Sequence, residues 1–408
     1  MSGCPVCDRP SAAPFLTRRH VSVHQNLVVE TPDAARALRA GTLSLHACEG
    51  CGFVFNAGFD ESLLQYGAEY DNTQTCSPAF QRHVDGRADH MVRARGVRDA
   101  AIVEIGCGKG SFLIALVERH AGNRGIGFDP SYVGPDTAAG GRVRFERRFY
   151  DESSASFEPD AIVCRHVIEH VPRPVEFLRT VRQTLRRPDA QVFFETPCVE
   201  WILTNDTVWD FCFEHCSYFS AGSLAHAFAR AGFALDGVTH VFVGQYLWAE
   251  ARPAANVRPA TTATRIADLA NRYAAREAAV VQDLRDRIGD LSRRGPVAIW
   301  GAGGKGVTLA SLVDPDATLL ACIIDINPKK QGKYLPGSAH PIVGPADLAR
   351  LGIRTALLTN PNYFEENSRI VRDAGLDVEL VDLMRSNDVP VALTVPAPSR
   401  DKAHADTD

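Results

Sequence analysis

Short apolar runs, each followed by glycines and then by a helix-like pattern, recur along the chain. The run at residues 101–105 leads into a glycine-rich turn and then into apolar residues at helical spacing. Residues 297–300 repeat this order before a second glycine-rich turn. A strand, a glycine turn and a helix in succession are typical of the βαβ units that build parallel sheets. The pattern therefore predicts two separate α/β units.

A long amphipathic segment joins these two units. Apolar residues from Ile266 to Leu291 recur at three- or four-residue steps, which gives a helix with one apolar face. Gly289 weakens the end of this helix and Gly295 stops it. We expect the helix to pack within its own chain rather than to form a coiled-coil seam between two chains.

Two cysteine pairs near the N-terminus indicate a metal site. Eleven cysteines scattered through 408 residues do not look like a secreted disulfide framework. Four of them form two C-x2-C pairs, which can present four thiolates in a tetrahedral cage for Zn²⁺: Cys4, Cys7, Cys48 and Cys51. Because protein fills all four positions, the zinc is expected to be structural. Incidental cysteines or a redox pair are the alternatives.

Charge and targeting signals exclude some partners. A net charge of −5 gives no global reason to expect nucleic acid. The N-terminus has no signal-peptide pattern, and no apolar stretch approaches the roughly 20 residues of a membrane helix. We expect a soluble, cytoplasmic protein, a monomer or homodimer, that acts on a small molecule and binds neither nucleic acid nor membrane.

The first glycine turn has the features of a cofactor site. Its strand carries Glu104 and is followed by three glycines that let a ligand approach the helix N-terminus: Gly106, Gly108 and Gly110. The next strand ends in Asp129, which is placed to bind ribose hydroxyls. His166 ends a later strand, at the edge that faces the ligand crevice. A nucleotide-binding domain of another kind is the alternative.

These motifs carry a family resemblance. E-x-G-x-G-x-G with an acid after the second strand resembles the class I S-adenosylmethionine-dependent methyltransferases, as does EHV at residues 169–171. Together with the cysteine pairs, GAGGKGVTLASLV at 301–313 and DINPKKQGKYLPG at 325–337, the chain resembles the deoxysugar C-methyltransferases over residues 4–385. The resemblance implies S-adenosylmethionine as cofactor and a ketosugar linked to a nucleoside diphosphate (NDP) as substrate.

The predicted fold is α/β, with a class I methyltransferase Rossmann-like core, a small N-terminal zinc-binding module and a second Rossmann-like C-terminal domain. The C-terminal domain is expected to close the substrate site. The predicted parts are a zinc-binding module at 1–75, the core at 76–255, a linker helix at 256–295, the C-terminal domain at 296–388 and a disordered tail at 389–408.

The stretch CFEHCSYFS at residues 212–220 occupies the position of the family's active-site run, which reads close to Y-H-E-H. The chain keeps Glu214, His215 and a later Tyr218, but has Cys212 and Phe213 where the family has tyrosine and histidine. These departures leave the methyl acceptor open. A structural polar patch and a second metal site are the alternative interpretations of this stretch.

Carbon methylation requires loss of a proton next to a ketone, so a base is needed. An ordinary imidazole is mostly the free base at neutral pH. His215 is therefore the predicted base, while Glu214 orients a hydroxyl or the base, or removes the proton itself. Tyr218 is predicted to donate a hydrogen bond to the developing enolate.

The resemblance adds further substrate contacts. It places Tyr70, and less directly Tyr66, near the sugar. It also directs Lys305, at the second glycine turn, toward the diphosphate. His83 and His90 are expected at the surface or on a helix face, and His170 is expected to be part of a helix.

Three other functions stay open at this point. The second turn, with Gly301, Gly303 and Gly306, also fits a dinucleotide fingerprint and thus a nicotinamide-dependent oxidoreductase. The altered active-site run is compatible with O- or N-methylation of another small metabolite. A methyltransferase-like binding protein without turnover is the third possibility.

Overall fold

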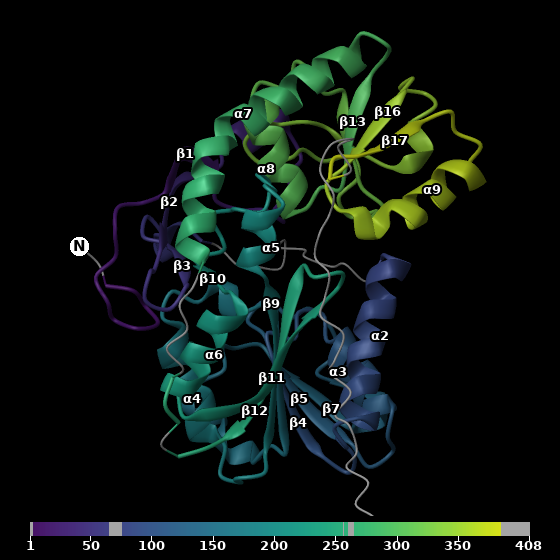
Figure 1. Cartoon of the computed structure of the whole chain (residues 1–408). Helices are drawn as coiled ribbons and strands as arrows, with labels where there is room; N and C mark the ends of the chain where they lie inside the picture. The colour runs from purple at the N-terminus through teal and green to yellow at the C-terminus, as the bar shows by residue number, and fades with distance from the viewer. Residues whose placement is uncertain (1–2, 65–75, 256, 260–264, 385–408) are drawn as a thin grey trace, which may run out of the picture.

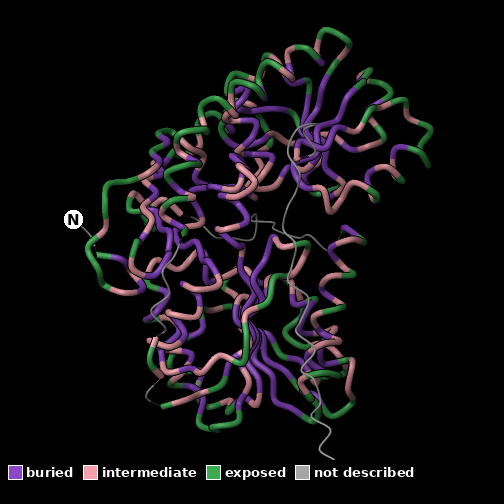
Figure 2. The backbone as a smooth tube through the Cα atoms, in the orientation of Figure 1, coloured by how far each residue is buried: buried purple, intermediate pink, exposed green. Residues whose placement is uncertain are grey.

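The computed structural model describes residues 3–64, 76–255, 257–259 and 265–384. Tyr66 and Tyr70 lie outside these ranges. Figure 1 shows the N-terminal module beside two α/β parts, one built on the strands β4 to β12 and one on β13 to β17. The central strands of both sheets are buried, whereas loops and outer helix faces are exposed (Figure 2). No helix in the described part of the chain is long and apolar enough to span a bilayer.

The N-terminal module is a four-stranded antiparallel sheet in the order β1-β2-β3-β10. Three strands come from the first 56 residues, and β10 comes from the middle of the chain: β1 (Leu16–Ser22), β2 (Ala40–Ala47), β3 (Val54–Asn56) and β10 (Ser217–Tyr218). In this pairing Ser217 lies opposite Phe55, and Tyr218 lies opposite Val54. The predicted zinc module therefore holds the residues that directly follow His215. The short helices α1 (Pro32–Arg36) and η1 (Glu61–Leu63) complete it.

The core is an eight-stranded sheet in the order β11-β12-β9-β8-β4-β5-β7-β6. Its strands are β4 (Ala101–Ile105), β5 (Arg124–Phe128), β6 (Thr137–Ala138), β7 (Val143–Glu146), β8 (Ala161–Arg165), β9 (Gln191–Pro197), β11 (Phe233–Val241) and β12 (Tyr246–Pro253). The strand β4 is buried along its whole length because helices cover both faces of the sheet. The order reverses between β4 and β8, so a ligand crevice is expected at their carboxyl ends.

The helices of the core lie on both faces of this sheet, with α2 and α3 on one side and α4 and α6 on the other (Figure 1). They are α2 (Pro78–Arg93), α3 (Ser111–Glu118), α4 (Pro174–Thr184), α5 (Val199–Thr204) and α6 (Ala221–Arg230), with 3₁₀ turns η2 (Ala139–Gly141), η3 (Glu152–Phe157) and η4 (Ile168–His170). This doubly wound arrangement is the predicted fold of the core.

The C-terminal domain is a second, fully parallel sheet in the order β15-β14-β13-β16-β17. Its elements are β13 (Val297–Trp300), α8 (Gly304–Val313), β14 (Cys322–Ile324), β15 (Ile342–Val343), η5 (Pro345–Asp347), β16 (Thr355–Leu358), η6 (Pro361–Tyr363), α9 (Phe364–Asp373) and β17 (Glu379–Asp382). This sheet also reverses its order around the first strand, as a Rossmann-like sheet does. The predicted fold class, with two α/β parts, is confirmed.

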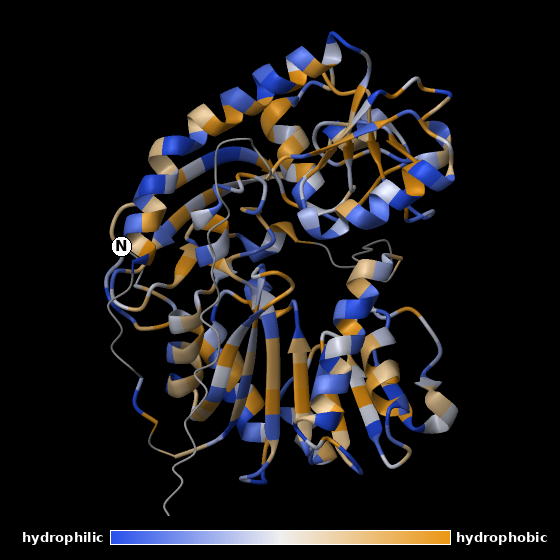
Figure 3. Cartoon of the chain, turned by 45° about the vertical axis from the view of Figure 1, so that its right-hand side comes forward, coloured by the Kyte–Doolittle hydropathy of each residue, from blue (hydrophilic) through white to orange (hydrophobic). Residues whose placement is uncertain are grey.

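The helix α7 (Ile266–Ser292) joins the two parts. It packs on α5 and α8 of its own chain. Its buried residues, which include Tyr273, Leu284 and Ile288, follow the predicted apolar face, and its outer face is mostly hydrophilic (Figure 3). Gly289 lies inside the helix and does not end it.

Candidate active site

A cavity of about 310 Å³ lies between the core and the C-terminal domain. The core contributes the segment after β8, the stretch around residues 209–215 and the start of β12. The C-terminal domain contributes its glycine turn and the loop that leads into α9. Gln25 and Asn26 of the N-terminal module complete the wall. All three parts of the protein therefore meet at one cavity.

The three glycines of the first turn have different structural roles. All have positive φ, from 55° to 79°. A Cβ at Gly106 would lie 2.2 Å from Val167, and one at Gly110 would lie 2.4 Å from Phe145, so packing excludes a side chain at both. A Cβ at Gly108 would meet nothing within 4 Å. Gly108 therefore leaves open the space in which a cofactor fits against the helix N-terminus.

The two predicted cofactor acids each accept a hydrogen bond from the backbone of the turn or of the helix that follows it. Asp129 accepts a hydrogen bond from the backbone of Gly108 at 2.8 Å, and Glu104 accepts one from Leu113 at 3.1 Å. Burial raises the pKa of Glu104 to about 8, against the opposing effect of Arg165. A buried carboxylate of this kind favours a cation nearby, and S-adenosylmethionine carries both an ammonium and a sulfonium. The cradle thus fits the predicted cofactor.

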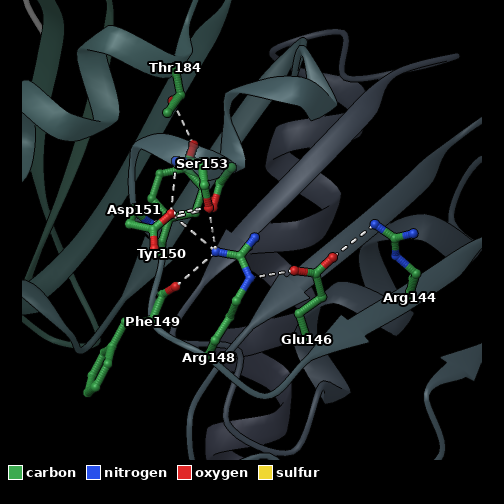
Figure 4. Close-up of polar contacts among 9 residues, drawn as sticks. Arg144, Glu146, Arg148, Phe149, Tyr150, Asp151, Ser153 and Thr184 are labelled. Atoms are coloured by element: carbon green, nitrogen blue, oxygen red, sulfur yellow. Dashed lines mark hydrogen bonds and ion pairs between the residues drawn. The ribbon is translucent and has the colours of Figure 1, made fainter.

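The loop after β7 lies at the same edge of the sheet as Asp129, whose backbone bonds to that of Glu146. Arg148 donates to Glu146 and Asp151 and to the backbone of Phe149, while the Phe149 ring points away from this cluster (Figure 4). The Phe149 side chain is 70% exposed. Sequence reasoning did not single out Phe149.

A cluster of charged side chains lies beside the cavity at the end of β8. The buried carboxylate of Glu195 contacts His166 at 2.8 Å, His83 at 3.0 Å and Arg165 at 3.1 Å. Burial acts to lower the pKa of His166, but Glu169 and Glu195 outweigh it and raise this pKa to about 9. The predicted cofactor residue His166 therefore lines the cavity as a cation. His83 lies on a face of α2, and its side chain is only 8% exposed because it bonds to Glu195. His90 is likewise paired, with Glu250 at 2.5 Å.

His215, the predicted base, lines the cavity next to His170. Their ring centroids are 4.8 Å apart, at an interplanar angle of 87°. Burial lowers the pKa of His215 to about 4, and His170 adds to this effect while Glu169 and Glu214 oppose it. The imidazole is therefore neutral at physiological pH. Sequence reasoning gave His170 only a structural role, because its contact with His215 depends on the tertiary fold.

Glu169 completes this group. One carboxylate oxygen of Glu169 and one ring nitrogen each of His170 and His215 lie within 4.8 Å of one another. Glu169 is already bonded to Thr196 at 3.1 Å and lies 3.4 Å from His166. Among the described residues, Cys212, Glu214, His215 and Cys216 do not form a metal-ligand group by themselves; His215 instead groups with Glu169 and His170.

Glu214 lines the cavity as expected of a site residue, whereas the Tyr218 hydroxyl is bonded within the active-site segment. Glu214 is buried and accepts a hydrogen bond from the backbone of Gln25 at 2.8 Å, although it also lines the cavity. The Tyr218 hydroxyl bonds to both the N–H and the carbonyl of Cys212, each at 2.9 Å. Tyr218 is not among the described residues that line the cavity. This placement favours a role in shaping the active-site segment over the predicted bond to an enolate.

Lys305 lines the cavity from the first turn of α8. Its ammonium is paired with Asp210 and lies 5.5 Å from the centre of the Trp201 ring. A second cation, Lys330, which sequence reasoning missed, donates to the carbonyl of Ala302 at 2.9 Å. Two ammonium groups therefore flank the second glycine turn.

Asp325 follows β14 and supports the second glycine turn. Its carboxylate accepts hydrogen bonds from the backbone of Ala302 and of Asn327, both at 2.8 Å. It therefore holds the glycine turn itself, and burial leaves it only 9% exposed.

The four N-terminal cysteines converge as the spacing predicts. Their sulfur atoms lie within 4.8 Å of one another, with Cys4 3.6 Å from Cys51 and Cys7 3.4 Å from Cys48. All four are free thiols. This donor set fits a tetrahedral Zn²⁺ site, which we propose it forms.

Two family models match different parts of the chain. Residues 80–238 match a methyltransferase domain, and residues 258–371 match the C-methyltransferase C-terminal domain. The second match accounts for the glycine turn that also fits a dinucleotide fingerprint.

Individual relatives extend this result. C-methyltransferase NovU of Streptomyces niveus is 30% identical over 370 residues, which cover 85% of this chain and 86% of that protein. A ubiquinone biosynthesis O-methyltransferase of Yersinia enterocolitica is 30% identical over 118 residues, 27% of this chain and 48% of that protein. The crystal structure of the dimethyltransferase RosA from Streptomyces davawensis is 22% identical, covers 43% of this chain and 54% of that one, and has a TM-score of 0.34. The near full-length match to NovU and the two domain matches agree: the chain belongs to the C-methyltransferase family and is an S-adenosylmethionine-dependent methyltransferase.

Proposed function

We propose that the protein methylates a carbon next to the ketone of an NDP-linked deoxyketosugar. The observation that carries this proposal is that His215 and the second glycine turn line the same cavity. One wall offers a neutral imidazole, and the other offers a helix N-terminus with Lys305 and Lys330. A substrate with an acidic C–H bond and a diphosphate is complementary to both walls.

The proposed reaction begins at His215. Its free nitrogen takes the proton from the carbon next to the ketone, and the electron pair of the broken C–H bond passes into an enolate. Glu169 and Glu214 favour the imidazolium that forms, since both act to raise the pKa of His215. S-adenosylmethionine, when bound, supplies the sulfonium methyl to which the carbon bonds. The walls of the cavity exclude water from the carbanion.

The adenine of the cofactor has a candidate platform. The parallel strands β4, β5 and β7 end at the same edge of the sheet, where Gly108, Asp129 and Phe149 follow them. An exposed aromatic ring at this edge suits a planar base. We assign Phe149 to this contact.

The test is transfer of labelled methyl from S-adenosylmethionine to a panel of NDP-ketosugars. The wild type is expected to form a product whose new methyl is bonded to carbon, as NMR would establish. His215→Ala is expected to lose at least about 100-fold in kcat, in line with the contribution of a general base. Its affinity for S-adenosylmethionine should stay unchanged.

Two results would overturn the proposal. Wild-type turnover by His215→Ala would remove the base. A product methylated on oxygen or nitrogen would place the protein with enzymes that need no carbanion.

A further inference from the structure

The hairpin between β11 and β12 has an unusual turn. Phe242, Val243 and Gly244 have φ values of 50°, 55° and 84°. Positive φ is uncommon for residues other than glycine, and least favourable for a β-branched residue such as Val243. Strained turns of this kind persist where the surroundings hold them, and they cluster at ligand sites.

Contacts from both α/β parts hold this turn. The Phe242 ring stacks on Tyr246 with centroids 5.1 Å apart, and it lies 5.9 Å from Phe80 of α2. The Phe242 carbonyl accepts a hydrogen bond from the side chain of Asn362 in the C-terminal domain at 3.2 Å. The turn therefore fixes the next two residues, Gln245 and Tyr246, both of which line the cavity.

The orientation of the Gln245 amide follows from the hydrogen bonds around it. The backbone N–H of Asn362 can only donate, and it donates to the side chain of Asn360 at 3.0 Å, so that atom is the oxygen of Asn360. The same oxygen meets the Gln245 side chain at 2.9 Å, so the Gln245 atom there is its NH₂. The other end of the Gln245 amide is therefore the carbonyl oxygen.

This carbonyl oxygen has no hydrogen-bond donor among the described residues, although Gln245 is only 3% exposed. One carboxylate oxygen of Asp210, which also lines the cavity, likewise has no hydrogen-bond donor among the described residues. Buried acceptors without donors are rare in folded proteins, and each requires an explanation. A ligand whose O–H or N–H groups enter the cavity explains both acceptors, because it supplies the missing donors.

We propose that Gln245 selects the methyl acceptor by accepting a hydrogen bond from one of its O–H or N–H groups. Asn360 acts as the positioning residue that keeps the amide oxygen available. This inference rests on the proposed function, because it takes the same cavity as the acceptor site. The donor is either a sugar hydroxyl or the imide N–H of the nucleobase.

Gln245→Met tests this inference, because methionine keeps the length of the side chain and removes its amide. KM for the ketosugar is expected to rise about 3- to 12-fold, the effect of one lost hydrogen bond. The variant also loses the bond from the Gln245 NH₂ group to Asn360, so the melting temperature of the ligand-free variant should fall slightly in any case. A merely structural role for Gln245 predicts this lower melting temperature with an unchanged KM. Val243→Ala, at the exposed position of the same turn, is the matched control and should leave KM unchanged.

Thymidine diphosphate, titrated by calorimetry, separates the two possible donors. If the variant binds it more weakly than the wild type by the same factor, the donor is the imide N–H. If thymidine diphosphate binds both proteins equally while the ketosugar KM rises, the donor is a sugar hydroxyl. An unchanged ketosugar KM overturns the inference.

Failure of the proposed function gives a different result. In that case the wild type methylates none of the ketosugars, and the affinity for thymidine diphosphate tests the role of Gln245. If Gln245→Met binds thymidine diphosphate more weakly than the wild type, Gln245 still contacts the ligand. If both proteins bind it equally, the inference is overturned.

Discussion

The imidazole rings of His170 and His215 meet edge to face, with their centroids 4.8 Å apart. His170 ends the turn η4 after β8, whereas His215 comes directly before β10 and the N-terminal module. Their contact therefore joins the cofactor-binding edge of the core to the segment that the module holds. Burial lowers the pKa of His215, and the neighbouring His170 adds to this effect.

The pH dependence of kcat/KM should reflect this contact. Since the pKa of His215 is about 4, the ring is free to accept a proton at pH 6–8, and activity should fall only as pH drops toward 4 and the ring is protonated. His170→Gln removes a group that lowers this pKa, so the acid limb should move to higher pH. A profile measured between pH 4 and 9 checks both expectations.

His120→Gln is the control for this profile. His120 lies beside Asp99, at the opposite end of the strands from the cavity, and its loss should leave the acid limb in place. An acid limb that is the same in the wild type and in His170→Gln would contradict the assigned contact.

Loss of zinc should affect the active site through the sheet of the N-terminal module. Cys48 and Cys51 lie between β2 and β3, and β3 pairs with β10, two residues beyond His215. Cys48→Ser should retain less than about half an equivalent of zinc, melt at a lower temperature and lose methyl transfer, because structural zinc contributes directly to folding. Elemental analysis and thermal unfolding are the measurements. Cys76→Ser, an exposed cysteine outside the group, should keep its zinc; a zinc-free wild type would contradict the prediction.

The position of the Tyr218 hydroxyl predicts a loss of stability rather than of chemistry. Tyr218→Phe leaves the buried N–H and carbonyl of Cys212 without this partner, which should lower the free energy of unfolding by about 1–3 kcal/mol. Tyr150→Phe, which loses a buried bond to Thr184 away from the cavity, should be destabilised similarly. Chemical denaturation and kcat are compared for both variants. A loss of kcat in Tyr218→Phe without a loss of stability would restore the predicted role at the enolate.

Features set by local backbone geometry were predictable from the sequence. The turn between β4 and α3 uses the positive φ of Gly106, Gly108 and Gly110. Each C-x2-C pair is likewise a local pattern, although the two pairs meet across 41 and 47 positions of the chain. The hydrophobic pattern likewise predicted α7, because a helix face repeats along the sequence.

Features that depend on contacts between distant segments were not predictable. His170 meets His215 at the cavity only because the fold brings their two segments together. The bond of the Tyr218 hydroxyl to Cys212 spans fewer positions, but no sequence motif signals it. Gln245 carries no motif, and its significance comes from Asn360, which lies 115 positions further along the chain. The pairing of Lys305 with Asp210 is equally invisible to sequence spacing.

Phe149 should contribute to cofactor affinity without affecting the fold. Its side chain is 70% exposed at the edge where the cofactor cradle lies, so its removal opens no cavity in the core. Phe149→Ala should weaken binding of S-adenosylmethionine about 2- to 12-fold, the range of one aromatic stacking contact. Phe149→Tyr keeps the ring and should bind as the wild type does. Calorimetry with S-adenosylmethionine, together with an unchanged melting temperature, checks the expectation; equal affinities for the alanine variant and the wild type would place the adenine elsewhere.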